Sequence, residues 1–374
     1  MSNSLLAKKI NLDLSIWTIV FPIFACLMLI PSIGNIFKSI HPISFELISG
    51  GFLIASVLAA VHHAEVVAHR VGEPFGTIIL ALAITVIEVS LIVSIMVSET
   101  GDQPSVLARD TVFAAIMIII TGIVGICLLI GGVRYREQNF IKQGVSTALI
   151  TLVAISVLTL VLPNFTTSEA GGVYSESQLL FVAIISLILY GGFISVQTIR
   201  HRNYFLPNHE DDNMSELHAD PPNNLTTTVS LILLILALIA VVLISKKLSP
   251  TVESFIIEIG APKSLVGIII ATVILLPEGL AALKAARRDR LQTSLNLALG
   301  SALASIGLTI PAVAIVCYFT GTTVTLGIDS KSIILLVLSL SALYLSLNTG
   351  RTNVQQGIVL LTLFATYLFT TIVP

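Results

Sequence analysis

Long, uninterrupted runs of apolar residues dominate the hydropathy pattern of the chain. Each run extends for about 20 residues, the length that an α-helix needs to cross the hydrocarbon core of a bilayer. None of them has the ~10-residue alternation of a membrane barrel strand, so the pattern excludes a transmembrane β-barrel. It predicts an all-α integral membrane protein with eleven transmembrane helices, at residues 15–34, 45–67, 75–98, 107–131, 144–162, 178–199, 226–245, 264–284, 292–319, 332–348 and 355–373.

Composition agrees with this prediction. Of the 374 residues, 55% are hydrophobic and 11% are charged, whereas soluble domains carry roughly 25% charged residues. The net charge of −2 gives no reason to expect nucleic acid as a partner. Cys26, Cys127 and Cys317 match no zinc or redox spacing. Because the chain also lacks a Gly-Lys-Ser/Thr phosphate loop, we expect no cofactor and no direct use of ATP.

The distribution of Lys and Arg predicts the orientation in the membrane. With a cytoplasmic N-terminus and an external C-terminus, thirteen of the 19 basic residues fall in cytoplasmic segments. The loop 163–177 contains no basic residue, as expected of an external loop. Span 15–34 resembles the apolar stretch of a signal peptide, but its length favours a retained anchor.

An acidic linker separates the two halves of the chain. Residues 200–225 form the longest hydrophilic stretch and contain the run His209-Glu210-Asp211-Asp212. The stretch is too short for a nucleotide-binding domain. It is interpreted as a solvated linker, with a cation-sensing or regulatory role as the alternative.

The two halves are related by a weak internal repeat. Glu88 and Glu278 are the only acidic residues well inside apolar spans, and they lie 190 positions apart. The same offset aligns span 75–98 with 264–284 and span 107–131 with 292–319. Each half then contains five spans, and an odd number of spans gives copies that enter the membrane from opposite sides. The predicted organisation comprises 1–40 (tail and first helix), 41–199 (first repeat), 200–225 (cytoplasmic linker) and 226–374 (inverted second repeat).

Glu88 and Glu278 are the candidate residues for the transport chemistry. A charged carboxylate at the bilayer centre costs at least ~2.5–3.5 kcal/mol, and no Lys or Arg lies inside either span to pair with it. Each Glu is therefore neutralised by a proton, or both are neutralised together by a bound metal cation. Because these two states exclude each other, they are what an antiporter needs. The alternative is a pair of permanently protonated structural residues.

Further oxygen ligands are expected close to these carboxylates. Pro and Gly beside Glu278 can free backbone carbonyls, and Ser301 and Ser305 share one helix face at the i, i+4 spacing. The candidate cation-lining residues are Thr85, Pro277, Gly279, Asn296, Gly300, Ser301 and Ser305, on spans that also offer Thr309. Helix packing through small residues is the alternative explanation for these positions.

A cluster of titratable residues follows the second span. It contains His62, His63, Glu65, His69 and Glu73, and its spacing does not match the His-Glu-x-x-His zinc signature. Because it lies at the predicted cytoplasmic end of span 45–67, it is a candidate proton relay or pH sensor. Solvation at the membrane interface is the simpler interpretation.

Three segments give the chain a family resemblance. They are Gly72-Glu73-Pro74-Phe75-Gly76 through Glu88, Leu276-Pro277-Glu278-Gly279-Leu280, and Leu297 to Gly307. The chain resembles the bacterial Cha-type antiporters, in the calcium/proton exchanger branch of the calcium/cation antiporter superfamily. This resemblance implies an eleven-helix inverted-repeat exchanger of the bacterial inner membrane that exports Ca2+ against protons, with Na+/H+ and K+/H+ exchange also associated with Cha-type members. It also implies that Glu88 and Glu278 are the paired acidic residues of the two repeats.

One departure from the family pattern affects the predicted substrate. Where the wider family has Gly-Asn ahead of each Glu, this chain has Ile84-Thr85 and Ile274-Leu275. Losing two side-chain amides weakens cation ligation and can favour monovalent ions.

We therefore expect a proton-coupled cation antiporter, not an enzyme, with Ca2+ as first candidate and Na+ or K+ next. A cation channel, or a cation carrier without proton coupling, is the alternative. The expected partners of this protein are inorganic cations, protons and the lipid bilayer. A homo-oligomer is possible on the sequence alone.

Overall fold

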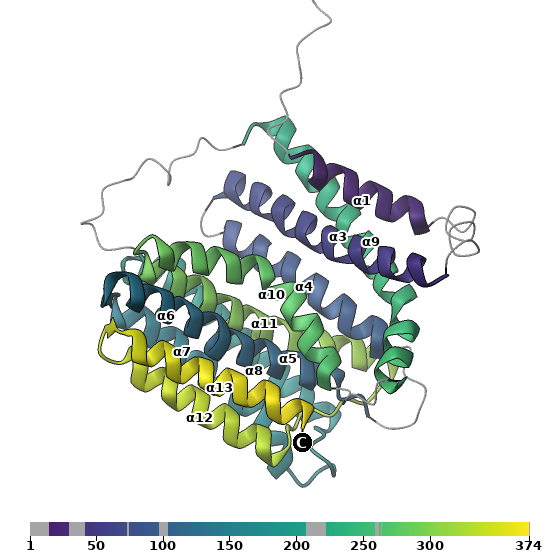
Figure 1. The fold of residues 1–374 in the computed structure, drawn as a ribbon. Helices are drawn as coiled ribbons and strands as arrows, with labels where there is room; N and C mark the ends of the chain where they lie inside the picture. Colours follow the sequence, from purple (N-terminus) through teal and green to yellow (C-terminus); the bar gives the residue numbers. More distant parts are fainter. Residues whose placement is uncertain are drawn as a thin grey trace, which may run out of the picture. The chain divides into compact units, whose positions relative to one another are not determined.

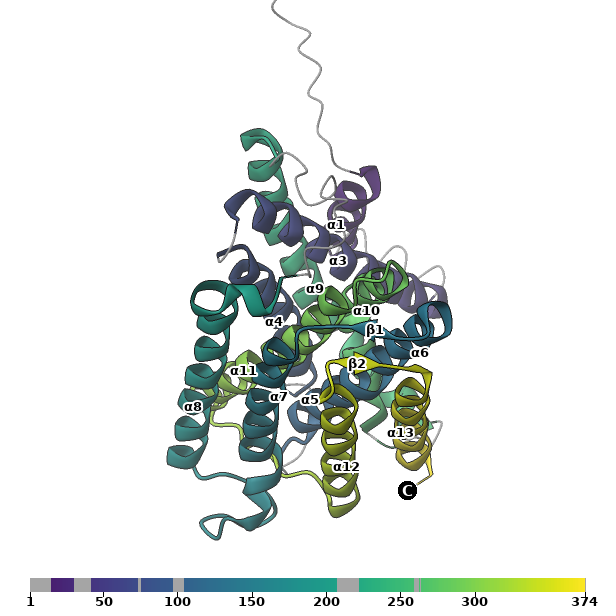
Figure 2. The same ribbon diagram turned by 90° about the vertical axis from the view of Figure 1, so that its left-hand side faces the viewer.

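The computed structural model is helical almost throughout (Figures 1 and 2). It describes residues 15–29, 42–72, 75–96, 104–206, 222–258, 262 and 264–373. In chain order the long helices are α1 (Ile16–Leu29), α3 (Pro42–Val71), α4 (Phe75–Met96), α5 (Leu107–Met117), α6 (Val124–Tyr135), α7 (Lys142–Ser156), α8 (Glu176–Ser195), α9 (Asn224–Glu258), α10 (Ser264–Arg287), α11 (Leu291–Thr320), α12 (Ser330–Leu347) and α13 (Val354–Ile372). The shorter elements are the π-helical turns η1 (Ile118–Ile123), η2 (Val157–Val161) and η4 (Val196–Arg200), the 3-10 turns η3 (Leu162–Phe165) and η5 (Arg202–Tyr204), and the strands β1 (Gln138–Asn139) and β2 (Arg351–Thr352).

The prediction of an all-α membrane protein is confirmed. Within the described residues, nine helices are long and apolar enough to cross a membrane, and Ile16–Leu29 and Ile79–Ser94 are shorter apolar helices. Together these segments coincide with the predicted spans. The largest difference is α9, which continues to Glu258, well past the expected end at residue 245. Pro250 lies inside this helix, so neither the proline nor the preceding Lys246-Lys247 pair ends it.

The described residues divide into two compact units. Unit 1 lies within residues 1–80 and 215–244, and unit 2 within 81–214 and 245–374. In unit 1, α1 packs along α3, and Cys26 Sγ contacts the carbonyl oxygen of Leu236 on α9 at 3.8 Å. Unit 2 contains Glu88 and Glu278.

The core of unit 2 consists of α11 and the continuous segment α5–η1–α6. These two are the most deeply buried of the candidate membrane spans in the described residues. In their most apolar stretches, 67% of the residues of α11 and 78% of those of α5–η1–α6 lie inside the protein. The offset of 190 residues that pairs the two Glu residues also pairs these two spans, which is the correspondence expected of a duplicated core. Around them, α10 packs on α5 and α11, α8 packs on α11, and α13 packs on α6.

Glycine permits the closest helix contacts in this core. A Cβ atom at Gly357 on α13 would lie 2.4 Å from the backbone nitrogen of Leu129 on α6. A Cβ atom at Gly267 on α10 would lie 2.8 Å from the backbone nitrogen of Thr111 on α5. Since apolar helices gain nothing by leaving lipid for one another, such close backbone approach is a main source of their association.

Contacts between loops sort the helix ends of unit 2 into two groups. At one end, called the ribbon end, β1 pairs with β2 in an antiparallel ribbon, visible in Figure 2, and Gln138 Nε2 donates to Asp289 Oδ1 at 2.7 Å. At the other, called the bridge end, Ser105 pairs with Val324 and Val173 with Thr325. Among the described loops of unit 2, those after α6, α10 and α12 lie at the ribbon end, and those after α7 and α11 lie at the bridge end.

Local signals determine several helix boundaries in unit 2. Ser175 and Gln178 form a capping box at the start of α8, and Asn353 and Gln356 form another at the start of α13. Next to the first box, burial raises the pKa of Tyr174 to about 12, and its hydroxyl donates to the carbonyl oxygen of Leu158 at 2.6 Å.

We expect Gly357→Ala to destabilise the protein, because the added methyl group must push apart the backbones of α13 and α6. Overpacking of this kind costs about 1–3 kcal/mol. The control is Gly191→Ala on α8, where a Cβ meets nothing within 4 Å and the better helix propensity of Ala contributes about 0.5–1 kcal/mol of stability. Thermal unfolding in detergent compares them, and equal midpoints would contradict the proposed contact.

Candidate cation site

Glu88 lies inside the protein and is held by two hydroxyl groups from another helix. Its side chain is 2% exposed. Ser305 Oγ donates to Glu88 Oε1 at 2.8 Å and lies 3.0 Å from Oε2, and Thr309 Oγ1 donates to Oε2 at 2.9 Å. Both oxygens of the carboxylate thus accept hydrogen bonds in the middle of an apolar span.

The spacing on α11 explains how both donors reach the same carboxylate. Ser305 and Thr309 are four residues apart, so they lie one above the other on a single helix face. Hydrogen bonds to a charged group contribute about 1.5–3 kcal/mol each, which offsets part of the cost of holding Glu88 in an apolar environment. Ser305 was among the predicted lining residues. Thr309 lies outside that predicted set, although continuing the i, i+4 series from Ser301 and Ser305 identifies it.

Glu278 lies on α10, which packs against α11 as well. Its two carboxylate oxygens are shielded from solvent. The helices α10 and α11 form an antiparallel hairpin, and Glu278 precedes the turn at Asp289 by as many residues as Gly300 follows it. Glu278 is therefore level with Gly300 and Ser301, about 7 Å along the α11 axis from Ser305 at ~1.5 Å per residue.

Gly300 and Ser301 leave room at this level of α11. A Cβ atom at Gly300 would meet nothing within 4 Å. The Ser301 hydroxyl is half-buried, and it makes no hydrogen bond within the described part of the chain. The role of these two residues as cation-lining positions stays a prediction.

The remaining predicted lining residues on α4 and α10 have local roles. Thr85 is buried, and its hydroxyl donates to the Ala81 carbonyl of its own helix at 2.8 Å. The helix α10 continues through Pro277, which has no N–H to donate to the preceding turn. A Cβ atom at Gly279 would lie 3.1 Å from Ile123 Cδ1, so this glycine permits close contact with η1.

Asn296 lies apart from Ser305, towards the ribbon end. Its Nδ2 donates to the carbonyl oxygen of Phe205 at 2.6 Å, and its Oδ1 accepts from Gln292 Nε2 at 2.9 Å. Nine residues separate it from Ser305, or about 14 Å along the helix. In this structure the amide therefore attaches the segment after α8 to the start of α11.

The titratable cluster on α3 faces in several directions. His63 is fully buried, and its Nε2 lies 3.0 Å from the carbonyl oxygen of Thr18 on α1. The ring of His62 lies 6.3 Å from that of Trp17. Glu65 and His69 are exposed. Glu73 lies outside the described residues, so the relay remains a prediction.

The two halves differ chemically at the matched positions. An offset of 190 places Ala115 opposite Ser305 and Ile119 opposite Thr309, and both of these residues are buried. Sequence comparison of the halves therefore predicts hydroxyl donors for one carboxylate only. The first half offers Glu278 no hydroxyl at the positions equivalent to those that hold Glu88.

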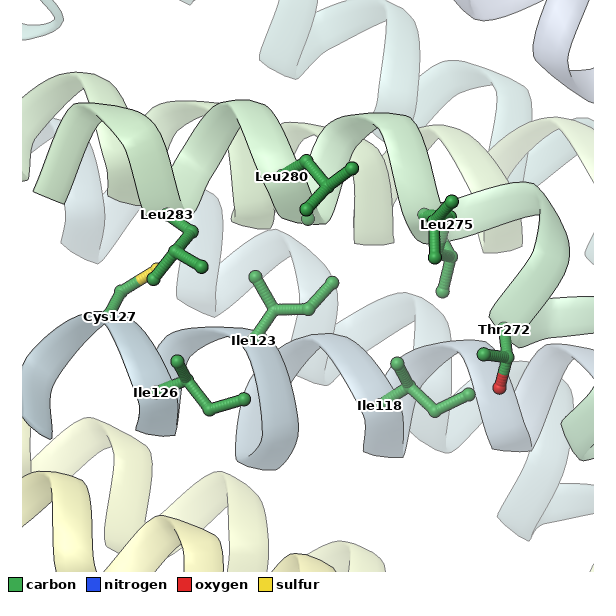
Figure 3. Close-up of a pocket in the computed structure, with 10 residues that line it drawn as sticks. Ile118, Ile123, Ile126, Cys127, Thr272, Leu275, Leu280 and Leu283 are labelled. Carbon is green, nitrogen blue, oxygen red and sulfur yellow. The ribbon is translucent and has the colours of Figure 1, made fainter. Parts of the chain in front are cut away.

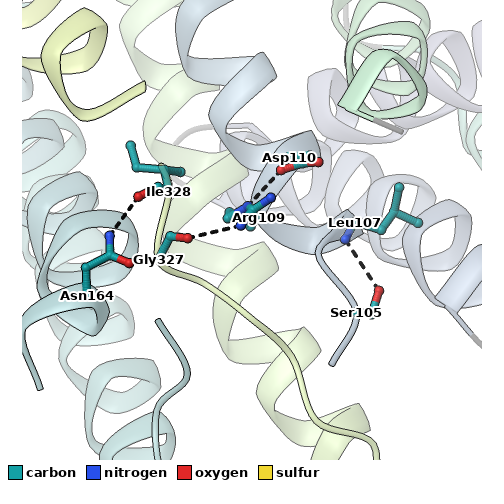
Figure 4. A network of polar contacts seen from close by, with 7 residues as sticks. All are labelled: Ser105, Leu107, Arg109, Asp110, Asn164, Gly327 and Ile328. Atoms are coloured by element: carbon teal, nitrogen blue, oxygen red, sulfur yellow. Dashed lines mark hydrogen bonds and ion pairs between the residues drawn. The ribbon is translucent and has the colours of Figure 1, made fainter. Parts of the chain in front are cut away.

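Two other features of unit 2 contrast with the surroundings of Glu88. Figure 3 shows an apolar cavity of about 210 Å³ between α10 and the η1–α6 segment, where Ile123 and Leu283 point into the space. It contains no charged side chain. Figure 4 shows a polar network at the bridge end, where Arg109 bonds to Asp110 and to the Gly327 carbonyl. Among the described residues, no three His, Cys, Asp or Glu side chains form a metal-binding group.

Comparisons with known proteins identify relatives across almost the whole chain. Residues 41–199 and 229–373 match the family model described as sodium/calcium exchanger protein. The sodium-potassium/proton antiporter ChaA of Escherichia coli (strain K12) is 38% identical over 85% of this chain and 86% of its own length. The selenium-substituted Ca2+/H+ antiporter protein YfkE has a similar fold, with a TM-score of 0.66 at 18% identity over 96% of this chain and 97% of that one. The H+/Ca2+ exchanger CAX gives 0.65 at 14% identity, over 94% and 89%.

We predict that Glu88 and Thr309 are energetically coupled. In a double-mutant cycle with Glu88→Gln and Thr309→Val, the coupling free energy of unfolding should be about 1 kcal/mol, because Gln replaces one of the two acceptor oxygens of Glu88 by an NH2 group and so disturbs the hydrogen bond from Thr309. The control pairs Glu88→Gln with Thr159→Val, whose buried hydroxyl bonds only to the Ile155 carbonyl. Denaturant unfolding in detergent gives these values, and additivity of the first pair would show that the hydrogen bond contributes nothing.

Proposed function

Because the chain belongs to the sodium/calcium exchanger protein family, we propose that it exchanges metal cations for protons across a bacterial inner membrane. Its substrates are Ca2+ and also Na+ and K+. The observation that carries this proposal is Glu88, which is 2% exposed within an apolar span and bonded to two hydroxyls of α11. No Lys or Arg lies in its span, so a proton or a metal ion must neutralise it.

The hydroxyls of Ser305 and Thr309 suit both states of such a site. A hydroxyl has one hydrogen and two lone pairs, and it can rotate to present either. Without a metal ion, both groups donate to Glu88, as their distances of 2.8 Å and 2.9 Å indicate. When a cation binds the carboxylate, the same oxygens can turn their lone pairs towards it as ligands. The site thus needs only a small rearrangement to alternate between proton and metal.

Glu278 supplies the second negative charge in this proposal. Two carboxylates balance one divalent cation or two protons, and hard cations such as Ca2+ are bound by oxygen ligands. Space beside Gly300 and the half-buried hydroxyl of Ser301, at the level of Glu278 on α11, support a shared site between the hairpin helices. Crossing the membrane with both carboxylates empty and charged would be costly, and this cost suppresses leak.

The number of oxygen ligands at the site affects how strongly it binds each of the three cations. The chain has Thr85 and Leu275 where side-chain amides are expected in the wider family, which lowers the number of neutral oxygen ligands. Fewer ligands weaken Ca2+ binding relative to binding of monovalent ions. The relative at 38% identity is named as a sodium-potassium/proton antiporter, whereas the two solved structures are named for Ca2+. We therefore propose all three ions as substrates.

The orientation and the cytoplasmic relay belong to the same proposal. We assign the ribbon end to the cytoplasm, because the ribbon-end segments 132–143 and 285–291 contain Arg134, Arg136, Lys142, Arg287, Arg288 and Arg290. For unit 1, Arg70 in the last turn of α3 assigns the exposed Glu65 and His69 to the cytoplasmic side by the same rule. The inverted repeats 41–199 and 226–374 provide one carboxylate each.

We expect Glu88→Gln and Glu278→Gln each to abolish exchange while the protein still inserts into the membrane. Each change removes one countercharge without altering side-chain size. The measurement uses a quenched pH-sensitive dye in everted vesicles, with Ca2+, Na+ and K+ added separately to release protons. Glu176→Gln, an exposed carboxylate in the first turn of α8, is the matched control and should transport normally.

The same assay separates the proposal from its alternatives. Near-normal proton movement in either Glu variant would refute the assigned site. Cation flux in the unmodified protein without proton movement would indicate a channel or an uncoupled carrier. The order of the three ions in the unmodified protein gives the substrate preference.

A further inference from the structure

The apolar cavity of Figure 3 is open along one side, between α10 and the η1–α6 segment. Three residues that line it, Ile126, Leu276 and Leu280, are 38%, 42% and 58% exposed. The hydroxyl of Thr272, which also lines it, donates to the carbonyl oxygen of Ile268 on its own helix at 2.7 Å. The cavity therefore presents an apolar surface that is accessible from outside the protein, and it offers no ligand to an ion.

The cavity extends along α10 for the depth of one bilayer leaflet. Its lining residues on this helix run from Thr272 to Leu283, which is about 16 Å at ~1.5 Å per residue. Half of a hydrocarbon core of ~30 Å is about 15 Å. Because α10 ends at Arg287, this stretch reaches from the middle of the span to one membrane interface. The depth of the cavity and its apolar lining fit a lipid acyl chain.

Two arginines continue the walls of the cavity at the ribbon end. On α10, Arg287 follows Leu283 by four residues, so it lies on the helix face that lines the cavity. On α6, Arg134 follows Cys127 by seven residues, which again places it on the lining face. The hydroxyl of Tyr135 donates to the Arg287 carbonyl at 2.9 Å and joins the last turns of the two helices. The arginines therefore flank the same end of the cavity.

This end of the cavity has an excess of positive charge. The segments 132–143 and 284–291 contain seven basic and two acidic residues, which gives a net charge of +5. The C-termini of α6 and α10 offset only about −0.5 each. Arg134, Lys284 and Arg287 are exposed, and no carboxylate of the described residues forms an ion pair with any of them. Their charges are therefore available to an anionic group beside the cavity.

We propose that the cavity binds one anionic phospholipid, with an acyl chain between α10 and α6 and the phosphate on Arg134 and Arg287. Basic residues beside an apolar groove between spanning helices bind an anionic headgroup together with its chain. Arginine suits a phosphate because its guanidinium donates two parallel hydrogen bonds. Gly279, which lines the cavity, follows Glu278. The bound chain thus excludes water from this side of α10, and its binding does not depend on the transport proposal.

The test measures which lipid contacts a tryptophan at the cavity of the full-length protein in vesicles. Trp17 is the only tryptophan of the chain, so Trp17→Phe removes the background and Leu280→Trp becomes the reporter. In mixtures of phosphatidylcholine and phosphatidylglycerol, brominated chains of either lipid quench the reporter on contact. We expect phosphatidylglycerol to bind at least about fivefold more tightly at this position, because each basic residue near the membrane surface contributes about that factor.

Two controls separate the cavity from the rest of the lipid-facing surface. Ile150→Trp on α7 places a reporter at an exposed position, eight residues from the ribbon end of its helix, as Leu280 is seven from Arg287. It should show little preference between the two lipids. Arg351→Gln removes an exposed arginine on β2, at the same end but outside the cavity. It should leave the preference at Leu280→Trp unchanged.

Substitution of the cavity arginines decides the inference. Arg134→Gln and Arg287→Gln should each lower the preference for phosphatidylglycerol at Leu280→Trp, and together they should abolish it. Equal quenching by the two lipids in Leu280→Trp would overturn the inference. A preference that persists without both arginines would overturn it as well. If Leu280→Trp does not yield folded protein, Ile126→Trp on the opposite wall is the reporter, and the same outcomes apply.

Discussion

A carboxylate within an apolar membrane span must be neutralised, and this constraint governs the arrangement around Glu88. On α11, the hydroxyl groups of Ser305 and Thr309 both donate hydrogen bonds to the Glu88 carboxylate. Such donors can share the charge, but they cannot cancel it, because they are neutral. In the proposed function, a proton or a metal ion balances the remaining charge, and the site is exposed to the other side of the membrane only when one of the two is bound. On that proposal, the electrostatic cost of an empty site couples the two fluxes.

The helix α11 has two tasks that depend on its small residues. It packs closely against α8 through Gly307, where a Cβ atom would lie 2.9 Å from Tyr190 Cβ, and it presents hydroxyls to Glu88 from the same stretch. The equivalent positions in the first half are Ala115 and Ile119. If the two halves are the inverted repeats that the sequence predicts, their matched core spans differ in chemistry at these two positions.

Most of the fold could be predicted from the sequence, because apolar runs of bilayer length have few alternatives. Acidic residues inside such runs are equally distinctive, so Glu88 and Glu278 were identifiable. Ser305 was predicted from its helical spacing, and its contact with Glu88 is now explicit. Asn296, which lies towards the ribbon end and apart from Ser305, shows the limit of this reasoning. Its spacing suits the site, but its hydrogen bond to Phe205 depends on how the segment after α8 folds back, and no local pattern contains that information.

The central claim is that one pair of carboxylates holds either protons or a metal ion. Calorimetric titration of the purified protein with Ca2+, Na+ or K+ tests this most directly when it is repeated in buffers of different ionisation enthalpy. The number of protons released per bound cation follows from the dependence of the heat on the buffer. We expect proton release to accompany cation binding in the unmodified protein and to be lost in Glu88→Gln and in Glu278→Gln. Cation binding of the same stoichiometry without any proton release would contradict it.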